Sequence, residues 1–327
     1  MNIQKRTIKI YIVTLILLGV ALFVSLGIGK YSVSLKDIFS NTLSMDKKVF
    51  FSLRLPRVLM GLVAGFGLAF SGSIYQTLFR NPLASPDIIG VASGASAGAA
   101  VSILFFGSAM WITAFSSFAG GFLAVLFVLG LTRVSGRQQM ATFVIAGVAV
   151  NALTEAILMV LKLTADPEKQ LASIEYWTMG SLAGVTDSKF YAILPFFIVS
   201  TIGLCILHRQ ISLLSLDSEY ARMLGVSVTK MRYIIMVLAT LMVGSVISIT
   251  GLIVFVGLMA PHLARMIMKS NRFSTMIYSG LLGGLLLIVA DCAARSISSS
   301  EVPISIVTSF IGAPFLIYLI CRKEKLA

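Results

Sequence analysis

The sequence predicts an all-α membrane protein: a polytopic bundle of about ten transmembrane helices in one domain covering residues 1–327. Hydrophobic residues make up 57% of the chain, charged residues only 12%, and the mean hydropathy is +0.97. A water-soluble domain of this size needs more polar surface than that composition supplies. The longest mainly polar stretch is residues 209–232, so any soluble machinery must belong to another chain.

Apolar stretches of membrane-crossing length recur along the whole chain. The first follows Lys5, Arg6 and Lys9 but lacks a small-residue cleavage site, so we interpret it as an uncleaved helix rather than a signal peptide. The second is too long for one straight crossing and must tilt, kink or protrude. The seventh and eighth almost join, with a boundary expected near Gly251. The predicted spans are residues 8–29, 48–79, 88–106, 110–132, 141–163, 189–208, 231–250, 252–268, 274–295 and 303–321.

An even number of spans places both termini on one side of the membrane. Lys and Arg are more frequent on that side, which the positive-inside rule makes cytoplasmic. The net charge of +13 therefore fits the cytoplasmic loops of a membrane protein better than a nucleic-acid partner. Residues 166–185 are too polar to span and contain Tyr176 and Trp177, which favours a short helix at the outer membrane interface.

The residue patterns of several kinds of functional site are absent from this sequence. The cysteines Cys205, Cys292 and Cys321 show no paired spacing, and the two histidines lie far apart, which argues against a metal site. There is no phosphate-binding G-x-x-x-x-G-K-[ST] stretch and no clustered nucleophile–base set. The sequence therefore predicts a chain that is not an enzyme and holds no cofactor.

Two arginines, Arg54 and Arg57, lie near the start of the second span in the stretch RLPR. If Pro56 lies in the first helical turn, Arg57 sits at a helix N-terminus, where a cation opposes the helix dipole. At a spacing of three residues the two side chains share a face. Two unpaired guanidiniums facing outward suit an acidic partner, because Arg binds carboxylates bidentately. The alternative is that both side chains snorkel to lipid phosphates.

The segment RNPLASPDIIG, which starts at Arg80, is predicted to end the second helix. Pro82 and Pro86 cannot continue a helix, and Asn81 and Ser85 supply capping oxygens. Non-helical backbone at membrane depth must be buried in protein or face a water-filled cavity. The glycines before and after this segment are spaced for close helix packing, so we assign them a structural role.

The segment SLDSEYARMLGVSVTKMRY, residues 215–233, is the most distinctive polar piece. Ser218 can cap a short helix, Glu219 suits its first turn, and Gly225 can end it. One side of that helix would be apolar, which suits docking into a groove on a partner. The alternative is a helix lying flat on the membrane surface. The apolar residues are Leu216, Tyr220, Met223 and Leu224.

Ionisable residues inside predicted spans are costly and often functional. Glu155, in the fifth span, is therefore a candidate for the lining of a passage. Asp291 has Arg295 four residues later, and an ion pair is the simple explanation. We expect a kink at Pro261, in the stretch GLIVFVGLMAPHLARM (residues 251–266). His262, which follows Pro261, is either a packed residue or a proton relay. Arg265 lies one helical turn further along.

Seven stretches together resemble one family in sequence and in order. These are permease subunits of the FecCD family, which belong to bacterial ATP-binding-cassette (ABC) importers for iron–siderophores, haem and vitamin B12. The resemblance covers nearly the whole chain and is most specific in the RNPLA-x-P and G-L-x-x-P-H-x-x-R segments. The stretches are RLPR (54–57), GLAFSGSIYQTLFRNPLASPDIIG (67–90), YWTMGSL (176–182), ARMLGVSVTKMR (221–232), FVGLMAPHLARM (255–266), VADCAAR (289–295) and EVPISIVTSFIGAPFLIYL (301–319).

The resemblance implies a type II ABC importer permease fold and a set of partners. Two permease subunits, identical or paralogous, would pair around a passage, with an ATPase dimer that binds ATP and magnesium inside and a substrate-binding protein outside. By position, Arg54, Arg57 and Arg295 would receive carboxylates of the binding protein. A coupling segment would dock in the ATPase groove; its residues are Asp217, Ser218, Glu219, Ala221, Arg222, Leu224 and Gly225.

Two functions compete at this stage. The first is an importer permease driven by ATP on another chain and carrying a ferric siderophore or related chelate, by alternating access. The second is an ion-coupled secondary transporter that uses Glu155.

Overall fold

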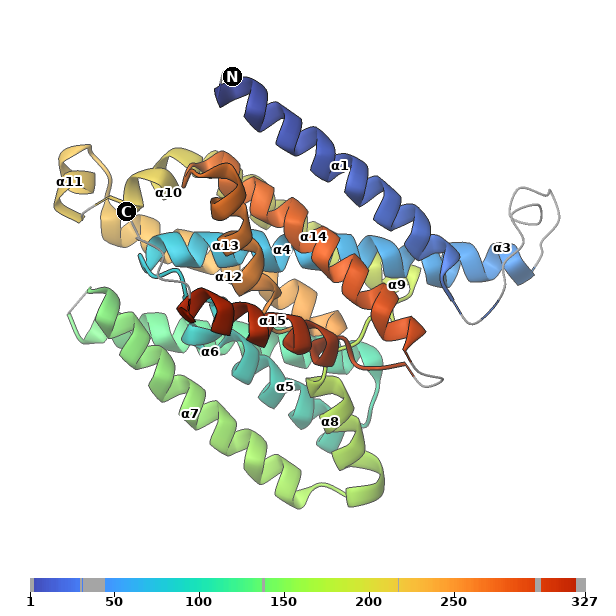
Figure 1. Ribbon diagram of the computed structural model, residues 1–327. Coiled ribbons are helices and arrows are strands. Elements are labelled where there is room, and N and C mark those ends of the chain that lie inside the picture. The colour runs from blue at the N-terminus through green and yellow to red at the C-terminus, as the bar shows by residue number, and fades with distance from the viewer. Residues whose placement is uncertain are drawn as a thin grey trace. The chain divides into compact units, whose positions relative to one another are not determined.

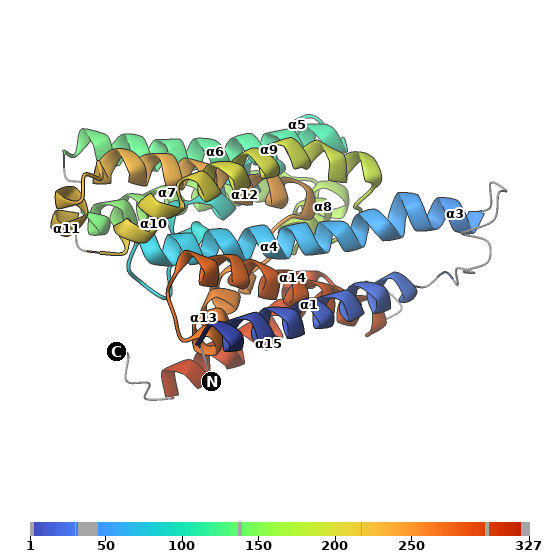
Figure 2. The same ribbon diagram turned by 90° about the horizontal axis from the view of Figure 1, so that it is seen from above.

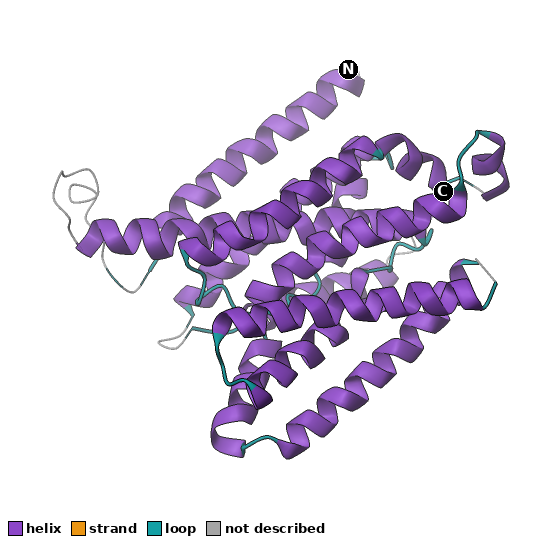
Figure 3. Ribbon diagram, turned by 180° about the vertical axis from the view of Figure 1, so that it is seen from behind, coloured by secondary structure: helices purple, strands orange, loops and turns teal. Residues whose placement is uncertain are grey.

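The computed structural model describes residues 3–29, 31, 45–136, 139–216, 218–297 and 301–321. Every regular element in these ranges is helical (Figure 3). Within the described residues, seven helices are long and apolar enough to span a membrane, and three shorter apolar helices bring the number to the predicted ten. The three shorter helices are Val91–Phe105, Val256–Met268 and Ile304–Leu319.

The chain folds into two compact units. Unit 1 contains residues 1–70, 181–192 and 253–327, and unit 2 contains residues 71–180 and 193–252. Two helices, α4 (Leu55–Leu78) and α9 (Asp187–Ile206), contribute residues to both units.

Unit 1 is organised around α14 (Phe273–Ser296). Helix α1 (Ile3–Gly27) runs beside it, and so do α13 (Val256–Met268) and α15 (Ile304–Cys321) (Figures 1 and 2). Close packing of α4 on α14 depends on glycine: a Cβ on Gly65 would lie 2.7 Å from the α-carbon of Gly284. The predicted structural role of the small residues is confirmed here.

The N-terminal end of α4 differs from the prediction. Helical structure begins earlier, in α3 (Met45–Val49), and reaches α4 through a π-helical turn, η1 (Phe50–Arg54). Pro56 lies in the first turn of α4 as expected, but it does not mark a free helix terminus. The wide turn accommodates a proline that lacks the N–H for a regular helical bond, so Arg57 is not at a helix N-terminus.

Unit 2 is built from α5 (Val91–Phe105), α6 (Met110–Val134), α7 (Met140–Thr164) and α12 (Val228–Thr250). Helix α5 packs along α6 and α7, and α12 packs on α6 (Figure 1). Gly94 allows a close approach of α5 to α6, because a Cβ there would lie 2.6 Å from the carbonyl oxygen of Gly120. Helix α12 ends at Thr250, and Gly251 follows with a φ of +67°, at the predicted boundary.

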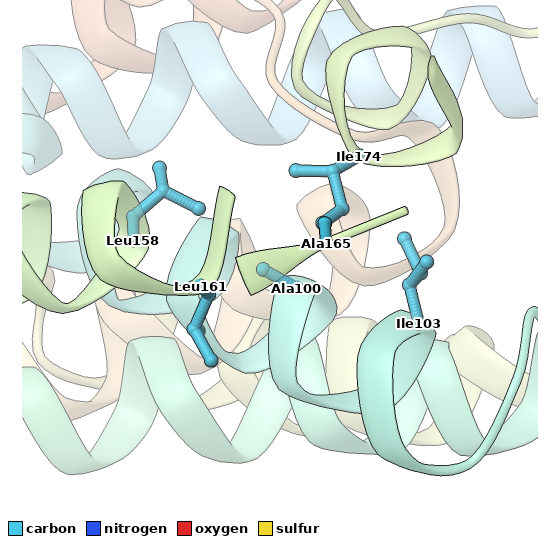
Figure 4. Close-up of a cluster of buried hydrophobic side chains, with 6 residues drawn as sticks. All are labelled: Ala100, Ile103, Leu158, Leu161, Ala165 and Ile174. Atoms are coloured by element: carbon cyan, nitrogen blue, oxygen red, sulfur yellow. The ribbon is translucent and has the colours of Figure 1, made fainter. Parts of the chain in front are cut away.

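The predicted interfacial segment is helical, in two pieces. A π-helical turn, η3 (Pro167–Leu171), is capped by the Asp166 side chain, and α8 (Ala172–Thr178) follows. Helix α8 packs on a buried apolar cluster through Ile174 (Figure 4). Trp177 packs against the same cluster. Lys162 of α7 also pairs with Glu175 of α8 at 2.9 Å. The buried cluster consists of Ala100, Ile103, Leu158, Leu161, Ala165 and Ile174.

Candidate functional site

The arginines of the RLPR stretch lie in unit 1 and are not exposed on an outward face. Arg54 is buried, and the Arg57 side chain is only 12% exposed. Arg57 pairs with Asp291 of α14 at 2.8 Å and with Glu301 at 3.0 Å. The expectation of two unpaired, outward-facing guanidiniums is therefore wrong, because carboxylates far away in sequence neutralise Arg57 and main-chain carbonyl oxygens bind Arg54.

Arg57, Asp291, Arg295 and Glu301 form one connected set, which we call the arginine network. Asp291 lies at its centre: both of its oxygens accept from Arg57, and Oδ2 also pairs with Arg295 at 2.9 Å. The predicted pair within α14 is therefore confirmed, with a second arginine added to it. Arg295 also donates to the Ile28 carbonyl at 2.7 Å and to Ser25 Oγ at 2.6 Å, which connects α14 to the end of α1.

Arg54 lies next in sequence to this network but binds differently. Its guanidinium donates to the main-chain carbonyl oxygens of Leu26, at 2.9 Å, Gly27 and Tyr31. No carboxylate among the described residues forms an ion pair with it. Three arginines thus share the two ion-paired carboxylates of this region, and Asp46 attracts Arg54 without forming an ion pair with it.

The predicted coupling segment lies in unit 2 and contains two helices. Helix α10 (His208–Leu214), which the sequence did not predict separately, precedes α11 (Ser218–Met223). Ser218 is the first residue of α11 rather than the residue before it, and Asp217 lies outside the described residues. Gly225 has a φ of +79° just after the helix, as expected for a helix-ending glycine.

Two arginines hold the start of α11 in place. Arg232, buried in α12, donates to Ser218 Oγ at 3.0 Å. Arg80 donates to the carbonyl oxygen of Leu216. Sequence reasoning missed both contacts. Arg80 and Leu216 are 136 residues apart, and the 14 residues between Ser218 and Arg232 include a loop whose path the sequence does not indicate.

One side of α11 is anchored and the other is uncovered. Ala221 is fully buried, whereas Glu219 and Arg222 lie on the less covered part of the helix. The predicted apolar side is present in this chain as an exposed surface. Its members are Leu216 (44% exposed), Tyr220 (67%), Met223 (84%) and Leu224 (55%).

The break after α4 lies where the sequence predicts it, but only one of the two predicted capping oxygens is used. Ser85 precedes the following 3₁₀ turn without a side-chain cap, and its hydroxyl donates to Asp87 Oδ2 at 3.5 Å. Helix α4 ends at Leu78, and Asn81 Oδ1 accepts a bond of 2.9 Å from the N–H of Leu83, which forms a side-chain-stabilised turn. Arg80 adopts a positive φ of 49°. Pro82 follows this turn, and Pro86 is the first residue of the 3₁₀ turn η2 (Pro86–Ile89).

Glu155 lies near the middle of α7, on a face that this chain leaves exposed. A polar cluster lies close by in sequence: Thr154 Oγ1 donates to Ser93 Oγ at 2.7 Å, and Ser93 Oγ donates to Asn151 Oδ1 at 2.6 Å. Asn151 also binds the carbonyl of Asp87 at 2.9 Å. Sequence reasoning missed this cluster, because Ser, Thr and Asn inside an apolar helix give only a weak signal.

The segment around Pro261 forms helix α13. Pro261 is buried inside this helix, and Arg265 is half-buried in its last turns. The His262 ring packs edge-on against Phe315 with ring centroids 6.0 Å apart. Within the described ranges no three His, Cys, Asp or Glu side chains gather in a way that could hold a metal ion.

These features define a class: a multi-pass helical membrane protein with a short anchored helix, apolar on its uncovered side, between two spans. The model of the FecCD transport family matches residues 16–322. The chain is 36% identical to the molybdate import system permease protein MolB of Haemophilus influenzae, over 95% of this chain and 94% of that protein. It is 33% identical to the Fe(3+)-citrate import system permease protein YfmE of Bacillus subtilis, over 98% of each.

A solved structure, described as an inward-facing metal-chelate type ABC transporter, matches with a TM-score of 0.86 and 35% identity. The match covers 95% of this chain and 98% of that one. The chain therefore belongs to the FecCD transport family. The resemblance and the type II importer permease fold inferred from the sequence are confirmed.

Family membership fixes the coarse role of the chain. It is a multi-pass permease subunit of an ABC importer and not itself an enzyme; nucleotide binding lies on the ATPase partner. An importer of this kind also works with a substrate-binding protein.

Proposed function

We propose that this chain translocates a ferric siderophore or a related metal chelate across the bacterial cytoplasmic membrane. The named iron-citrate relative and the metal-chelate type structure support a bulky chelate. The molybdate relative indicates that cargo varies within the family, so identity to one relative does not define it. The whole chain would act as one permease domain, with both termini in the cytoplasm.

The observation that carries the mechanism is the exposed apolar side of α11. Large apolar side chains such as Met223, 84% exposed, need a covering partner. We assign this partner to a groove on the ATPase, with the segment from Asp217 to Gly225 as the coupling element. Closure of the ATPase dimer on ATP would pull α11, and the contacts of Arg80 and Arg232 would transmit that motion to the ends of α4 and α12.

We also propose that the binding protein docks near Arg54, Arg57 and Arg295, although two of these arginines are already paired within the chain. The internal carboxylates Asp291 and Glu301 already occupy Arg57 and Arg295. An acidic residue of the binding protein would therefore pair with Arg54, which forms no ion pair among the described residues, or would replace Glu301. The side chain of Glu301 is 26% exposed.

The passage is assigned to the uncovered face of α7. An ionised carboxylate facing lipid at the middle of a span costs about 2.5–3.5 kcal/mol on insertion scales. Glu155 would avoid that cost by facing water in a passage shared with a second permease subunit, identical or paralogous.

The test uses proteoliposomes that contain this chain, the ATPase and the binding protein. Candidate cargoes are first titrated into the binding protein: ferric siderophores, haem, cobalamin and molybdate. We expect the binding protein to bind one ferric chelate saturably. We expect uptake of that chelate only when ATP is present on the side of the membrane that carries the ATPase. Binding of molybdate alone would overturn the chelate assignment and leave the ABC mechanism standing.

A separate arm tests the coupling element. Met223→Glu should leave insertion and folding unchanged, because Met223 is exposed, and should abolish ATP-driven uptake. Met45→Glu, at another exposed methionine that lies outside the segment and outside α7, controls for an added acid. Uptake that persists in Met223→Glu and collapses with a proton uncoupler would instead support an ion-coupled transporter.

A further inference from the structure

A cavity of about 760 Å³ lies in unit 2 beside the coupling segment. The end of α6, the last residues of the 218–226 segment and the first turns of α12 line it. Its polar lining includes Arg133, Arg222 and Lys230, and its apolar lining includes Val226 and Ile234. We call this cavity the basic groove.

The three cations of the basic groove are exposed side chains, and none forms an ion pair with a described residue. No acidic side chain appears in the described lining. Three like charges that converge on one cavity repel one another, and a bound anion would remove that repulsion. The groove also lies at the N-terminus of α12, a helix of 23 residues, whose first N–H groups favour negative charge.

The position of the groove selects among anions. Helix α6 ends at Val134 and α12 begins at Val228, and both helices are long and apolar enough to span a membrane. The ends of spanning helices lie at the level of lipid headgroups, where basic pockets between helices bind anionic lipids. Tyr233, whose hydroxyl lies 3.1 Å from Thr132 Oγ1, adds an amphipathic wall of the kind found at that depth.

We propose that the basic groove binds the phosphate headgroup of an anionic phospholipid. The guanidiniums of Arg133 and Arg222 and the ammonium of Lys230 contact the phosphate oxygens. Val226 and Ile234 contact the first methylenes of an acyl chain. Inorganic phosphate would satisfy the cations but leave this apolar wall in water, so the observations favour a lipid over a free anion.

The site adjoins the segment assigned to ATPase coupling, because Arg222 belongs to α11. A bound lipid would brace α11 against α6 and α12. The effect of lipid composition on ATP-driven uptake rests on the proposed function, whereas lipid binding itself does not depend on it.

Native mass spectrometry of the purified chain tests the proposal, with phosphatidylglycerol, phosphatidylcholine and inorganic phosphate as probes. We expect the wild type to retain phosphatidylglycerol and not phosphatidylcholine. The combined change Arg133→Gln, Arg222→Gln and Lys230→Gln should weaken phosphatidylglycerol binding by about tenfold or more. A matched variant, Lys5→Gln, Lys9→Gln and Arg272→Gln, removes three exposed cations outside the groove and should bind like the wild type.

A charge-conserving variant, Arg133→Lys with Arg222→Lys, keeps the test valid if the triple variant fails to fold, and it should keep most of the lipid binding. Equal phosphatidylglycerol binding in the wild type and the triple variant would overturn the proposal. So would full displacement of the lipid by millimolar phosphate, which would make the groove a free-anion site. A cysteine can be introduced into the groove as Lys230→Cys. If this cysteine crosslinks to the ATPase in the assembled transporter, the groove binds that protein and not a lipid.

Discussion

The arginine network of unit 1 and the basic groove of unit 2 are both clusters of cations at the ends of apolar helices. They differ in whether the chain itself neutralises the cations. In the network, Asp291 and Glu301 neutralise arginines whose side chains are 5–12% exposed. In the groove, Arg133, Arg222 and Lys230 are exposed and have no ion-pair partner among the described residues. Burial therefore demands internal partners, whereas exposure leaves charge available to a ligand.

This difference also changes what each cluster contributes. The network joins α1, α4, α14 and the chain before α15, so its ion pairs serve the packing of unit 1. The groove and the exposed side of α11 contribute little to the isolated chain and present surfaces to partners. The predictions below test this contrast in order of expected effect.

The largest effect is expected from Asp291→Ala. The change leaves Arg57 and Arg295 without their shared carboxylate, and breaking a buried pair typically costs about 3–5 kcal/mol. Denaturant or thermal unfolding in detergent measures the loss. Glu301→Gln is the control, because Glu301 is partly exposed and Arg57 keeps Asp291. Equal losses in the two variants would show that Asp291 is not the centre of the network.

An intermediate effect is expected from Arg232→Met. This side chain is buried and donates to Ser218 at the start of α11, and a hydrogen bond from a charged group contributes about 1.5–3 kcal/mol. Limited proteolysis should cut the 209–225 segment faster, while the helices of unit 1 keep their resistance. Arg209→Gln, an exposed neighbour on α10, serves as the comparison. An unchanged cleavage rate would mean that Arg232 does not anchor α11.

The smallest effect on stability is expected from Arg222→Gln. An exposed cation without an ion-pair partner contributes within about 0.5 kcal/mol, so the unfolding midpoint should match the wild type. A destabilisation comparable to that of Arg232→Met would contradict the description of the groove as a surface that awaits a ligand.

The sequence predicted elements whose signals are local. Helix lengths follow from apolar runs, Gly251 and Gly225 mark the predicted helix ends, and the pair Asp291–Arg295 follows from its spacing within one helix. The ten spans and the family were therefore accessible without a structure.

The errors concern contacts between distant residues. Arg57 and Asp291 are 234 residues apart, so nothing near Arg57 indicates that its charge is already neutralised. The contact of Glu301 with Arg57 was missed for the same reason. The contact of Arg232 with Ser218 spans only 14 residues but crosses the loop between α11 and α12, whose path the sequence does not indicate. The π-helical turn at Phe50–Arg54 was also missed, because the apolar run predicts a helix there but not its hydrogen-bonding pattern. The roles assigned to the docking arginines, to α11 and to Glu155 stay predictions.

The central claim is that this permease moves cargo only when a separate ATPase acts through α11. The most direct measurement is accumulation of radiolabelled cargo in proteoliposomes, with and without the ATPase, the binding protein and ATP. The account predicts accumulation against a gradient only when all three are present, and none with Met223→Glu. Accumulation by the purified chain alone would contradict it.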